Sequence, residues 1–400
     1  MITAGSSYTD TRYRASVGIG YDGVVRVSAG GNFGTGTLLF DGRAVLTAAH
    51  LIAGVVGPVS VTFDTQAGAQ TLQASKTLVN PTYLLANSNA DLALVWLSGA
   101  PLAAATRYDI YRDSNELGQV FTMVGFGQTG TGSTGATSTN PNALRLKAQN
   151  TFETDAATMK SALGSAMAWS PTAGTQLVAD FDNGTSTNDA LGRLMHLNDL
   201  GLGLNEGLIA HGDSGGPAFL QGKLAGVASY TSSLSYGLID PDVDWLTNSS
   251  FGEIAAWQRV SAFQQWIDQS VRANYPNAPT KPADVKKEVT EGNSGTTLAY
   301  FLVQFTGTRL DASKVVSVDY ATRDGSATAG SDYLAVAGRL NLYPGETQAA
   351  IAVEIVGDTV REGNENFYLD VFNPVGAIFG PDIVKLTAVR TILDDDVALG

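Results

Sequence analysis

A proline-rich segment near residue 280 divides this chain and limits what it can fold into. Three prolines stand within residues 273–282. Because proline lacks an amide hydrogen and fixes φ, such a run interrupts helices and sheets and is typical of an extended linker. Apolar side chains recur at helical spacing over residues 260–271, which predicts a helix at the end of the first domain. We therefore expect domains at 1–275 and 284–400, joined by a linker at 276–283.

Both domains are predicted to be all-β. Short β-branched and apolar runs are separated by Gly, Asn and Asp in the first domain; the clearest are 36–40, 59–63 and 92–97. The Gly/Thr/Ser-rich stretch 125–139 is expected to be a loop, and 156–167 a helix. Apolar residues alternate with period two after residue 281, in about seven short runs. This pattern predicts a β-sandwich in the second domain.

Composition excludes several classes of function. The net charge of −14 argues against nucleic acid or anionic lipid as a partner, because both require basic patches. The absence of cysteine rules out disulfides, thiol catalysis and thiolate metal sites. No apolar run approaches the roughly 18 residues of a membrane span. The first residues carry no secretion signal, which leaves open a cytoplasmic protein or a processed chain end.

The most informative motif is Gly-Asp-Ser-Gly-Gly-Pro at 212–217. Glycines around Ser214 allow the backbone to bend sharply and to present its N–H groups to a ligand. His50 follows an apolar strand, and Asp91 begins another. A serine hydroxyl needs a base that takes its proton, and the base needs an acid that orients it. All three residue types are present, in the order His, Asp, Ser.

These motifs resemble the trypsin/chymotrypsin family over about residues 2–272. The matching segments are Thr-Ala-Ala-His at 47–50, Asp-Leu-Ala-Leu at 91–94, the nucleophile motif at 212–217, and 124–129, 222–230 and 257–260. The resemblance implies two six-stranded antiparallel β-barrels with a C-terminal helix. It also implies Ser214 as nucleophile, His50 as general base and then acid, and Asp91 as orienting carboxylate. The N–H groups of Gly212 and Ser214 would form the oxyanion hole, and catalysis would need no cofactor.

The same resemblance places five residues at the substrate pocket: Leu208 at its floor, with His211, Ser229, Thr231 and Ala255 around it. An acidic floor would select Lys or Arg, but leucine offers no counter-charge, and burying an unpaired cation is costly. We therefore expect cleavage after small to medium apolar residues.

The start of the chain is similar in spacing to activated members of this family. In them the α-ammonium of a newly exposed isoleucine pairs with the Asp before the nucleophile, here Ile2 and Asp213. Met1 blocks Ile2, so we expect a chain that begins at Ile2 to be much more active. The alternative is that Asp213 is satisfied by an internal partner.

The segment 141–206 is longer than its counterpart in the family. It contains acidic residues at 180–184 and 188–189. Their spacing resembles a calcium loop but lacks the EF-hand pattern, so a solvated turn is the favoured interpretation. An effect of the segment on substrate access also remains open.

Acidic residues in the second domain cluster where the predicted strands end. Carboxylates from several loops suit calcium, which takes six to eight oxygen ligands; the alternative is a solvated acidic edge. The pattern resembles the Calx-β domain over about 284–397. The ligands implied are Glu291, Asp332, Asp358, Glu362, Glu365, Asp394, Asp395 and Asp396. Gly357 replaces an acid found in some members, which weakens one ion site.

Together these features predict a secreted, bacterial-type serine endopeptidase with a calcium-binding accessory domain. Its partners would be protein or peptide substrates, with cell-surface or matrix components bound through the sandwich. Two other functions remain open: a non-catalytic adhesion or scaffold protein with a protease-like domain, and a serine esterase.

Overall fold

The computed structural model describes residues 2–138, 143–309 and 311–396. By its internal contacts the chain forms two compact units, one of residues 1–39 with 43–264 and one of residues 40–42 with 265–400. Within the described parts, no helix is both long and apolar enough to cross a membrane. The domain limits expected from the sequence stay predictions.

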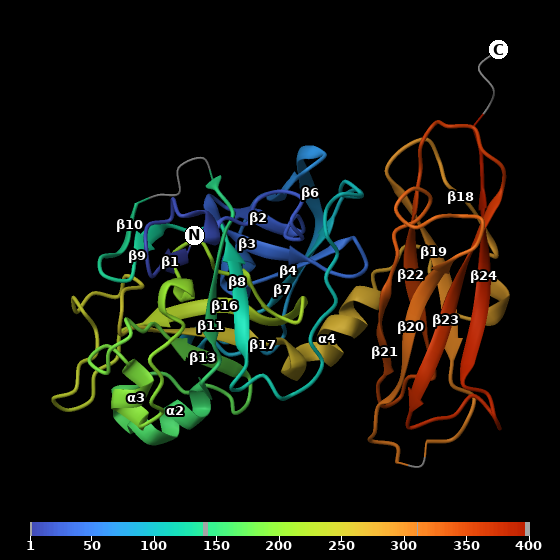
Figure 1. Ribbon diagram of the computed structural model, residues 1–400. Helices are drawn as coiled ribbons and strands as arrows, with labels where there is room; N and C mark the ends of the chain where they lie inside the picture. The colour runs from blue at the N-terminus through green and yellow to red at the C-terminus, as the bar shows by residue number, and fades with distance from the viewer. Residues whose placement is uncertain (1, 139–142, 310, 397–400) are drawn as a thin grey trace. The chain divides into compact units, whose positions relative to one another are not determined.

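A closed six-stranded barrel forms the first half of the first unit, drawn in blue in Figure 1. Its strands, in barrel order, are β2 (Val24–Ala29), β3 (Asn32–Leu38), β4 (Ala44–Thr47), β7 (Ala93–Leu97), β6 (Gly68–Val79) and β5 (Val59–Thr65). Alternating residues of β5, Val59, Val61 and Phe63, are buried in its core. The strands predicted from the β-branched runs and the first six-stranded barrel that the resemblance implies are both confirmed.

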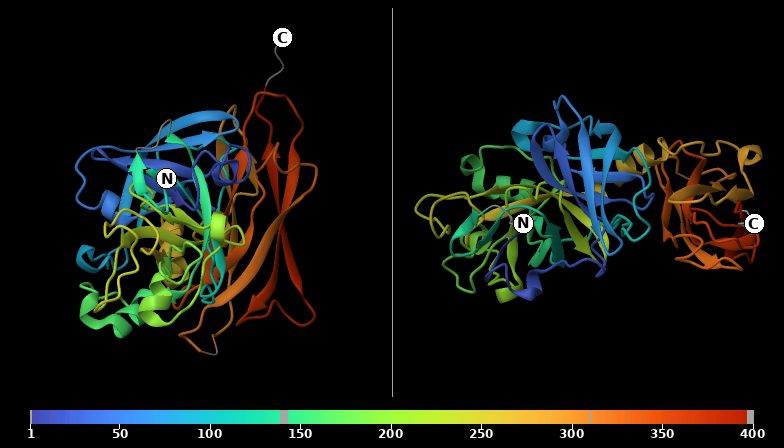
Figure 2. Two further views of the ribbon diagram at one scale, coloured as in Figure 1. Left: turned by 60° about the vertical axis from the view of Figure 1, so that its left-hand side comes forward. Right: turned by 90° about the horizontal axis from the view of Figure 1, so that it is seen from above.

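A seven-stranded antiparallel sheet forms the second half of this unit. In sheet order its strands are β11 (Leu146–Thr151), β8 (Val120–Gly125), β15 (Pro217–Leu220), β16 (Lys223–Ser232), β17 (Ile254–Arg259), β13 (Gln176–Asp180) and β12 (Thr154–Asp155). Trp257 is fully buried, and its ring packs edge-on against Phe121 and Phe152. The barrel and this sheet lie side by side in both views of Figure 2.

Within the described residues, β11 and β13 form no backbone ladder with each other, and a side-chain amide links them instead. The Asn150 amide in β11 donates to the carbonyl oxygen of Asp180 in β13 at 2.6 Å and to that of Gly207 at 3.0 Å. The trypsin-like all-β fold is therefore confirmed, with a seven-stranded barrel-like sheet where we expected a second six-stranded barrel.

A smaller four-stranded sheet corrects one expectation. Its order is β10 (Gly135–Ser138), β9 (Thr129–Thr131), β1 (Ile2–Ala4) and β14 (Gly207–Ile209). The stretch 125–139, expected to be a loop, thus contributes two strands; its last residue lies outside the described residues. Pairing with the distant β1 supplies the hydrogen bonds, so tertiary context overrides the weak β propensity of a Gly-rich sequence.

Besides the short α1, the described residues form three α-helices and several 3₁₀ turns. The helices are α2 (Ala156–Leu163), α3 (Ala190–Met195) and α4 (Val260–Arg272). The Asp155 carboxylate caps α2 by accepting from the N–H groups of Ala157 and Thr158. The 3₁₀ turns are η1 (Thr11–Tyr13), η2 (Leu85–Asn87), η4 (Gly164–Ala166), η5 (Gly203–Asn205) and η6 (Pro282–Asp284). Helix α4 begins in the first unit and ends in the second, and η6 lies in the second unit. The helices expected at 156–167 and 260–271 are present.

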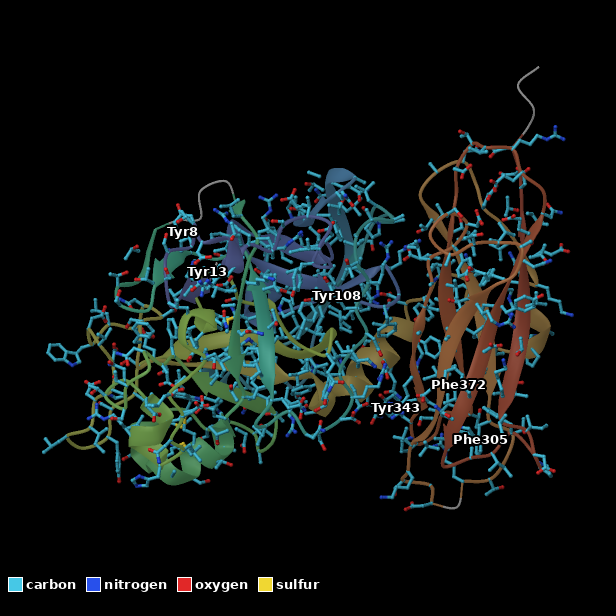
Figure 3. All side chains as sticks on the ribbon, in the orientation of Figure 1. Tyr8, Tyr13, Tyr108, Phe305, Tyr343 and Phe372 are labelled. Atoms are coloured by element: carbon cyan, nitrogen blue, oxygen red, sulfur yellow. The ribbon has the colours of Figure 1, made fainter. Side chains whose placement is uncertain are left out.

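The segment that leads from the barrel to the sheet is anchored to both. Tyr108, labelled in Figure 3, pairs with Leu39 at the end of β3, and its ring lies 4.6 Å from that of Phe219 in β15. Its hydroxyl donates to the carbonyl oxygen of Gly20 at 2.6 Å. Two residues later, Ile110 bridges to Leu224 in β16. These contacts fix the barrel against the sheet.

The second unit contains the predicted β-sandwich, drawn orange to red in Figure 1. One sheet has the order β18 (Glu288–Thr290), β24 (Lys385–Leu393), β23 (Glu365–Val375), β20 (Val316–Asp324) and β21 (Ala337–Leu342). The other pairs β19 (Thr296–Gln304) with β22 (Gln348–Val356). Phe301 of β19 and Phe367 of β23 meet edge to face in the shared core.

Candidate active site

A histidine and an aspartate meet at the open end of the first barrel. His50 lies in the short helix α1 (Ala49–Ile52), directly after β4, and Asp91 precedes β7. Because β4 and β7 pair antiparallel, with Thr47 opposite Ala93, the two side chains converge. Asp91 Oδ2 lies 2.7 Å from His50 Nδ1, and Asp91 Oδ1 accepts the His50 backbone N–H at 2.8 Å. The carboxylate thus fixes the ring by Nδ1 and leaves Nε2 for proton transfer.

Ser214 belongs to a segment of the second half that is fastened to the first barrel. Thr35 in β3 donates its N–H to the carbonyl oxygen of Ser214 at 2.8 Å and its hydroxyl to that of Gly212 at 3.0 Å. Gly215, at φ +81°, packs so closely on Thr47 that a Cβ atom would overlap the threonine hydroxyl. The nucleophile segment therefore lies against the end of β4, three residues before His50.

The backbone of this segment also presents two free donors. Gly212 adopts φ +95°, a region that glycine enters without steric cost. Within the described parts of the chain, the N–H groups of Gly212 and Ser214 donate to no protein acceptor. By contrast, the N–H groups of Asp213 and Gly215 bond to the carbonyl oxygens of Ala210 and Ala228. The two free donors flank the nucleophile, as an oxyanion hole requires.

Two polar residues support Asp91 in ways that the sequence did not reveal. Ser229, predicted as a substrate-pocket residue, donates its hydroxyl to Asp91 Oδ2 at 2.6 Å. The Gln258 amide donates to Ser229 Oγ at 3.3 Å and to the carbonyl oxygen of Ser88 at 2.7 Å. Asp91 is only 2% exposed, and these hydrogen bonds hold its carboxylate in the orientation that faces His50. Nothing in the linear pattern around Ser229 or Gln258 pointed to this role.

The predicted substrate pocket is only partly accessible. Leu208 and Ala255 are completely buried and belong to the core of the second half, so neither offers surface to a substrate. This corrects their assignment as pocket floor and wall. Thr231 is partly exposed, and His211 is exposed with its ring edge-on to Phe33 at 5.8 Å. These two remain accessible pocket candidates.

The predicted activation pair lies close to the nucleophile segment. The Asp213 carboxylate is buried and accepts the N–H groups of Gly127 at 2.9 Å and Ala210 at 2.8 Å. Burial raises its pKa, and the hydrogen bond from Ala210 is among the interactions that oppose that shift. Ile2 is buried in β1, opposite Ile209, which precedes Ala210. Met1 lies outside the described residues, so the pairing of an Ile2 ammonium with Asp213 stays a prediction.

The predicted calcium ligands of the second unit gather in two clusters. Carboxylate oxygens of Glu291, Asp394 and Asp396 lie within 4.8 Å of one another, as do those of Asp332, Glu362 and Glu365. Burial, and then repulsion from neighbouring acids that include Asp358, raises the pKa of Glu291 and that of Glu362, so Asp358 lies near both clusters. Asp395 is exposed and accepts the Gly292 N–H at 3.1 Å.

The chemistry of these clusters suits a hard cation. Glu291 is 5% exposed, its Oε1 has no hydrogen-bond partner, and burial with neighbouring charge raises its pKa to about 7. A divalent cation would neutralise this repulsion and satisfy the orphaned oxygen. The residues present therefore fit calcium.

The acids of the long segment in the first unit do not form a solvated turn. Asp180, Asp182 and Asp189 are 0%, 2% and 1% exposed, and their carboxylates converge. The solvated interpretation is therefore wrong. This burial could not be predicted from the sequence, because the residues that cover these acids are distant from them in the chain.

Family comparisons agree with this architecture. The Trypsin family model matches residues 6–188, and the Calx-beta domain model matches residues 284–397. The chain therefore carries a trypsin-like serine protease domain followed by a Calx-beta domain. The trypsin match includes His50 and Asp91 and ends before Ser214.

Similar proteins fall into two groups. The second domain is 39% identical over 90 residues to the sodium/calcium exchanger Calx of Drosophila melanogaster, which covers 22% of this chain and 9% of that protein. It is 43% identical over 94 residues to sodium/calcium exchanger 2 of Homo sapiens, and this match covers 20% of this chain and 10% of that protein. The chain thus spans about a tenth of these relatives' length. Among solved structures, neuropsin, a serine protease expressed in the limbic system of mouse brain, gives a TM-score of 0.47 at 18% identity, covering 65% of this chain and 98% of that chain.

Proposed function

We propose that this protein is a serine endopeptidase. The observation that carries the proposal is the doubly bonded His50–Asp91 pair beside a glycine-bounded serine with two free N–H donors. The same groups in the same order perform acyl transfer in the family that the first domain resembles.

In the proposed mechanism, Ser214 Oγ attacks the scissile carbonyl carbon while His50 Nε2 takes its proton. The carbonyl oxygen becomes an oxyanion and accepts hydrogen bonds from the N–H groups of Gly212 and Ser214. Asp91 stabilises the imidazolium through Nδ1. His50 then donates the proton to the leaving amine as the C–N bond breaks. A water molecule activated by His50 hydrolyses the acyl-enzyme and regenerates Ser214.

Two assays test this proposal. The purified chain should be labelled by a fluorophosphonate and should digest casein, and Ser214→Ala should lose both activities. Absence of labelling in the folded wild-type chain would favour the adhesion or scaffold function. Labelling without digestion of any protein or peptide would favour the esterase. Glu291→Gln, a change in the second unit, is the control that should keep both activities.

We further propose a preference for small to medium apolar residues before the cleaved bond. The two residues that remain accessible at the predicted pocket, Thr231 and His211, include no acidic group that would pair with a Lys or Arg side chain. A panel of chromogenic peptides that differ only at this position tests the preference. Faster cleavage after Arg or Lys would contradict it.

The second domain is proposed to bind calcium through the two acidic clusters described above. The buried, unpartnered Glu291 supports this proposal, because an isolated buried carboxylate is costly without a counter-charge. Calorimetric titration of the full Ser214→Ala chain should show calcium binding that Glu291→Gln weakens. Identical titrations of the two proteins would leave the solvated acidic edge as the explanation.

Secretion from a bacterium is proposed on chemical grounds. Weak calcium sites fill only where calcium is abundant, as it is outside cells. The sandwich would there bind cell-surface or matrix components. Immunodetection of the protein in culture medium and in cell fractions tests this location, and exclusive recovery from the cytoplasm would contradict it.

The N-terminal activation mechanism is part of the same proposal. An Ile2 ammonium paired with Asp213 would hold the Gly212 and Ser214 N–H groups in place. A chain that begins at Ile2 should therefore digest peptides much faster than one that begins at Met1. Asp213→Asn in the Ile2 form should abolish the advantage. Equal turnover by the two forms would refute the mechanism.

A further inference from the structure

Five carboxylates lie close together within the long segment 141–206 of the first unit. Asp180 ends β13, Asp182 follows it, and Asp189 precedes α3, the green helix at the lower left of Figure 1. One carboxylate oxygen of each lies within 4.8 Å of those of the other two. Glu153 and Glu206 join the group. Oε1 of Glu153 lies 3.4 Å from the Asp180 backbone nitrogen, and Oε1 of Glu206 accepts the Asp182 N–H at 2.8 Å.

Backbone donors satisfy only part of this acid cluster. Asp180 Oδ2 accepts the Leu191 N–H at 2.6 Å, and Asp189 accepts the Gly192 N–H at 2.5 Å. Oδ1 of Asp182 is buried and has no hydrogen-bond partner, although the residue is only 2% exposed. Oδ1 of Asp180 is buried and has no hydrogen-bond partner while both Asp180 and Glu153 are ionised, although a proton held between these two carboxyl groups would pair them. Oε2 of Glu153 is likewise buried and unpartnered. These orphaned oxygens belong to the group whose carboxylates converge.

No protein cation balances the charge. Among the described residues, no lysine or arginine forms an ion pair with any of the five acids. Burial and mutual repulsion raise the pKa values of Glu153, Asp180 and Asp182, and burial raises that of Glu206 to about 8. Either protons or a cation must therefore neutralise the cluster near pH 7.

Gly201 allows the backbone of the segment 182–206 to approach the carboxylates closely. Gly201, at φ +72°, lies so near that a Cβ atom would overlap Glu206 Oε2 and stand 2.8 Å from Asp182 Cβ. The backbone of the segment thus approaches the cluster where any other residue would collide with it. The Leu202 N–H next to Gly201 donates to Glu206 Oε2 at 2.6 Å, so this close approach satisfies Glu206 and leaves Asp182 Oδ1 unpartnered.

We propose that the protease unit holds a calcium ion between Asp180, Asp182 and Asp189. Every group offered is an oxygen, and calcium accepts many carboxylate oxygens in an irregular arrangement, whereas magnesium demands octahedral geometry and retains water. Glu153 and Glu206 lie around the ion and complete its negative surroundings. Asp180 and Asp182 gain a partner for their orphaned oxygens.

The ion would fasten the start of the segment 182–206, up to the residue that precedes α3, to the end of β13. This segment runs directly into β14, and β14 leads to Ser214 within a few residues. Calcium in this place would therefore stabilise the chain that delivers the nucleophile. It is separate from the acidic clusters of the second unit, and it does not depend on proteolytic activity.

Hydrogen exchange measured by mass spectrometry tests the proposal on the full chain. The background is Ser214→Ala, which prevents self-cleavage, with Glu291→Gln and Glu365→Gln to disable the clusters of the second unit. At about 1 mM calcium, the weak end of the range for extracellular sites, amide exchange across 182–206 should slow relative to EGTA. Magnesium at the same concentration should protect this segment less.

Variants of the cluster sharpen the test. Asp182→Asn should remove the calcium-dependent protection and weaken affinity at least roughly tenfold, the loss produced even by outer-shell changes. Asp113→Asn, which alters an exposed carboxylate elsewhere in the unit, is the matched control and should keep full protection.

Three results would overturn the proposal. Unchanged exchange across 182–206 in the background protein would show that the acid cluster holds protons only. Equal protection in Asp182→Asn would place the ion elsewhere, and equal protection by magnesium would refute the choice of calcium. The first comparison leaves the cluster unmutated, so it decides the matter even if Asp182→Asn fails to fold.

Discussion

Replacement of Gly215 by alanine should separate the cost of backbone strain from the cost of close packing at the nucleophile. Gly215 has φ +81°, a left-handed conformation that costs an alanine about 1–2 kcal/mol. A Cβ atom there would also overlap Thr47 Oγ1 and the Thr35 carbonyl oxygen, and would stand 2.8 Å from Ala48 N. Forcing extra volume into a packed site costs about 1–3 kcal/mol more. We expect Gly215→Ala to lower the free energy of unfolding by about 2–5 kcal/mol.

Gly222 provides the matched control. It has φ +75°, but a Cβ atom would meet nothing within 4 Å. Gly222→Ala should therefore cost only the conformational part, about 1–2 kcal/mol. Urea unfolding of both variants gives the two free energies, and fluorophosphonate labelling gives the reactivity of Ser214. A displacement of about 1 Å at the nucleophile should slow labelling roughly 100-fold in Gly215→Ala alone. Equal destabilisation and equal labelling of the two variants would refute the reasoning.

Three further changes test other contacts. Arg145→Met leaves Asp22 buried without its partner at 2.6 Å, and should lower the unfolding free energy by about 3–5 kcal/mol in urea; a loss below about 1 kcal/mol would contradict this. Ser229→Ala removes a charge-assisted bond to Asp91 worth about 1.5–3 kcal/mol, so labelling should slow roughly 10- to 100-fold, and an unchanged rate would count against its positioning role. Burial raises the pKa of Glu253 to about 7, so the stability it contributes is present below about pH 4 and is lost as pH rises through 7. Glu253→Gln should thus reduce the fall in unfolding free energy between pH 5 and 8, by on the order of 3 kcal/mol, and identical pH profiles would disprove it.

Much of the fold follows from short-range pattern. Alternation of buried and exposed residues, as in β5, predicts a strand with one face in the core. The reverse case is the stretch 125–139, in which β9 and β10 form although Gly, Thr and Ser provide little apolar alternation. Their pairing depends on β1, more than a hundred residues away in the sequence, and no local pattern contains that information.

The site divides in the same way. His50, Asp91 and Ser214 stand in distinctive motifs, so their roles can be predicted residue by residue. Ser229 and Thr35 are single polar residues within strands, and their importance comes from what they contact across the fold. Leu208 is the opposite case: its place before the nucleophile motif predicted a substrate contact, but the side chain is completely buried. Sequence position alone does not reveal which way a side chain points.

The two hydrogen bonds from Thr35 make the position of Ser214 depend on a residue that is synthesised much earlier in the chain. Thr35 and Gly212 lie 177 residues apart in the chain, yet one threonine holds the carbonyl groups on both sides of Asp213. During synthesis, the nucleophile can adopt this geometry only after the barrel has folded and the second sheet has docked on it. A nascent or partly opened chain therefore has the residues of a protease without its reactivity. Loss of docking between the two halves should therefore abolish the proposed proteolytic activity before either half unfolds.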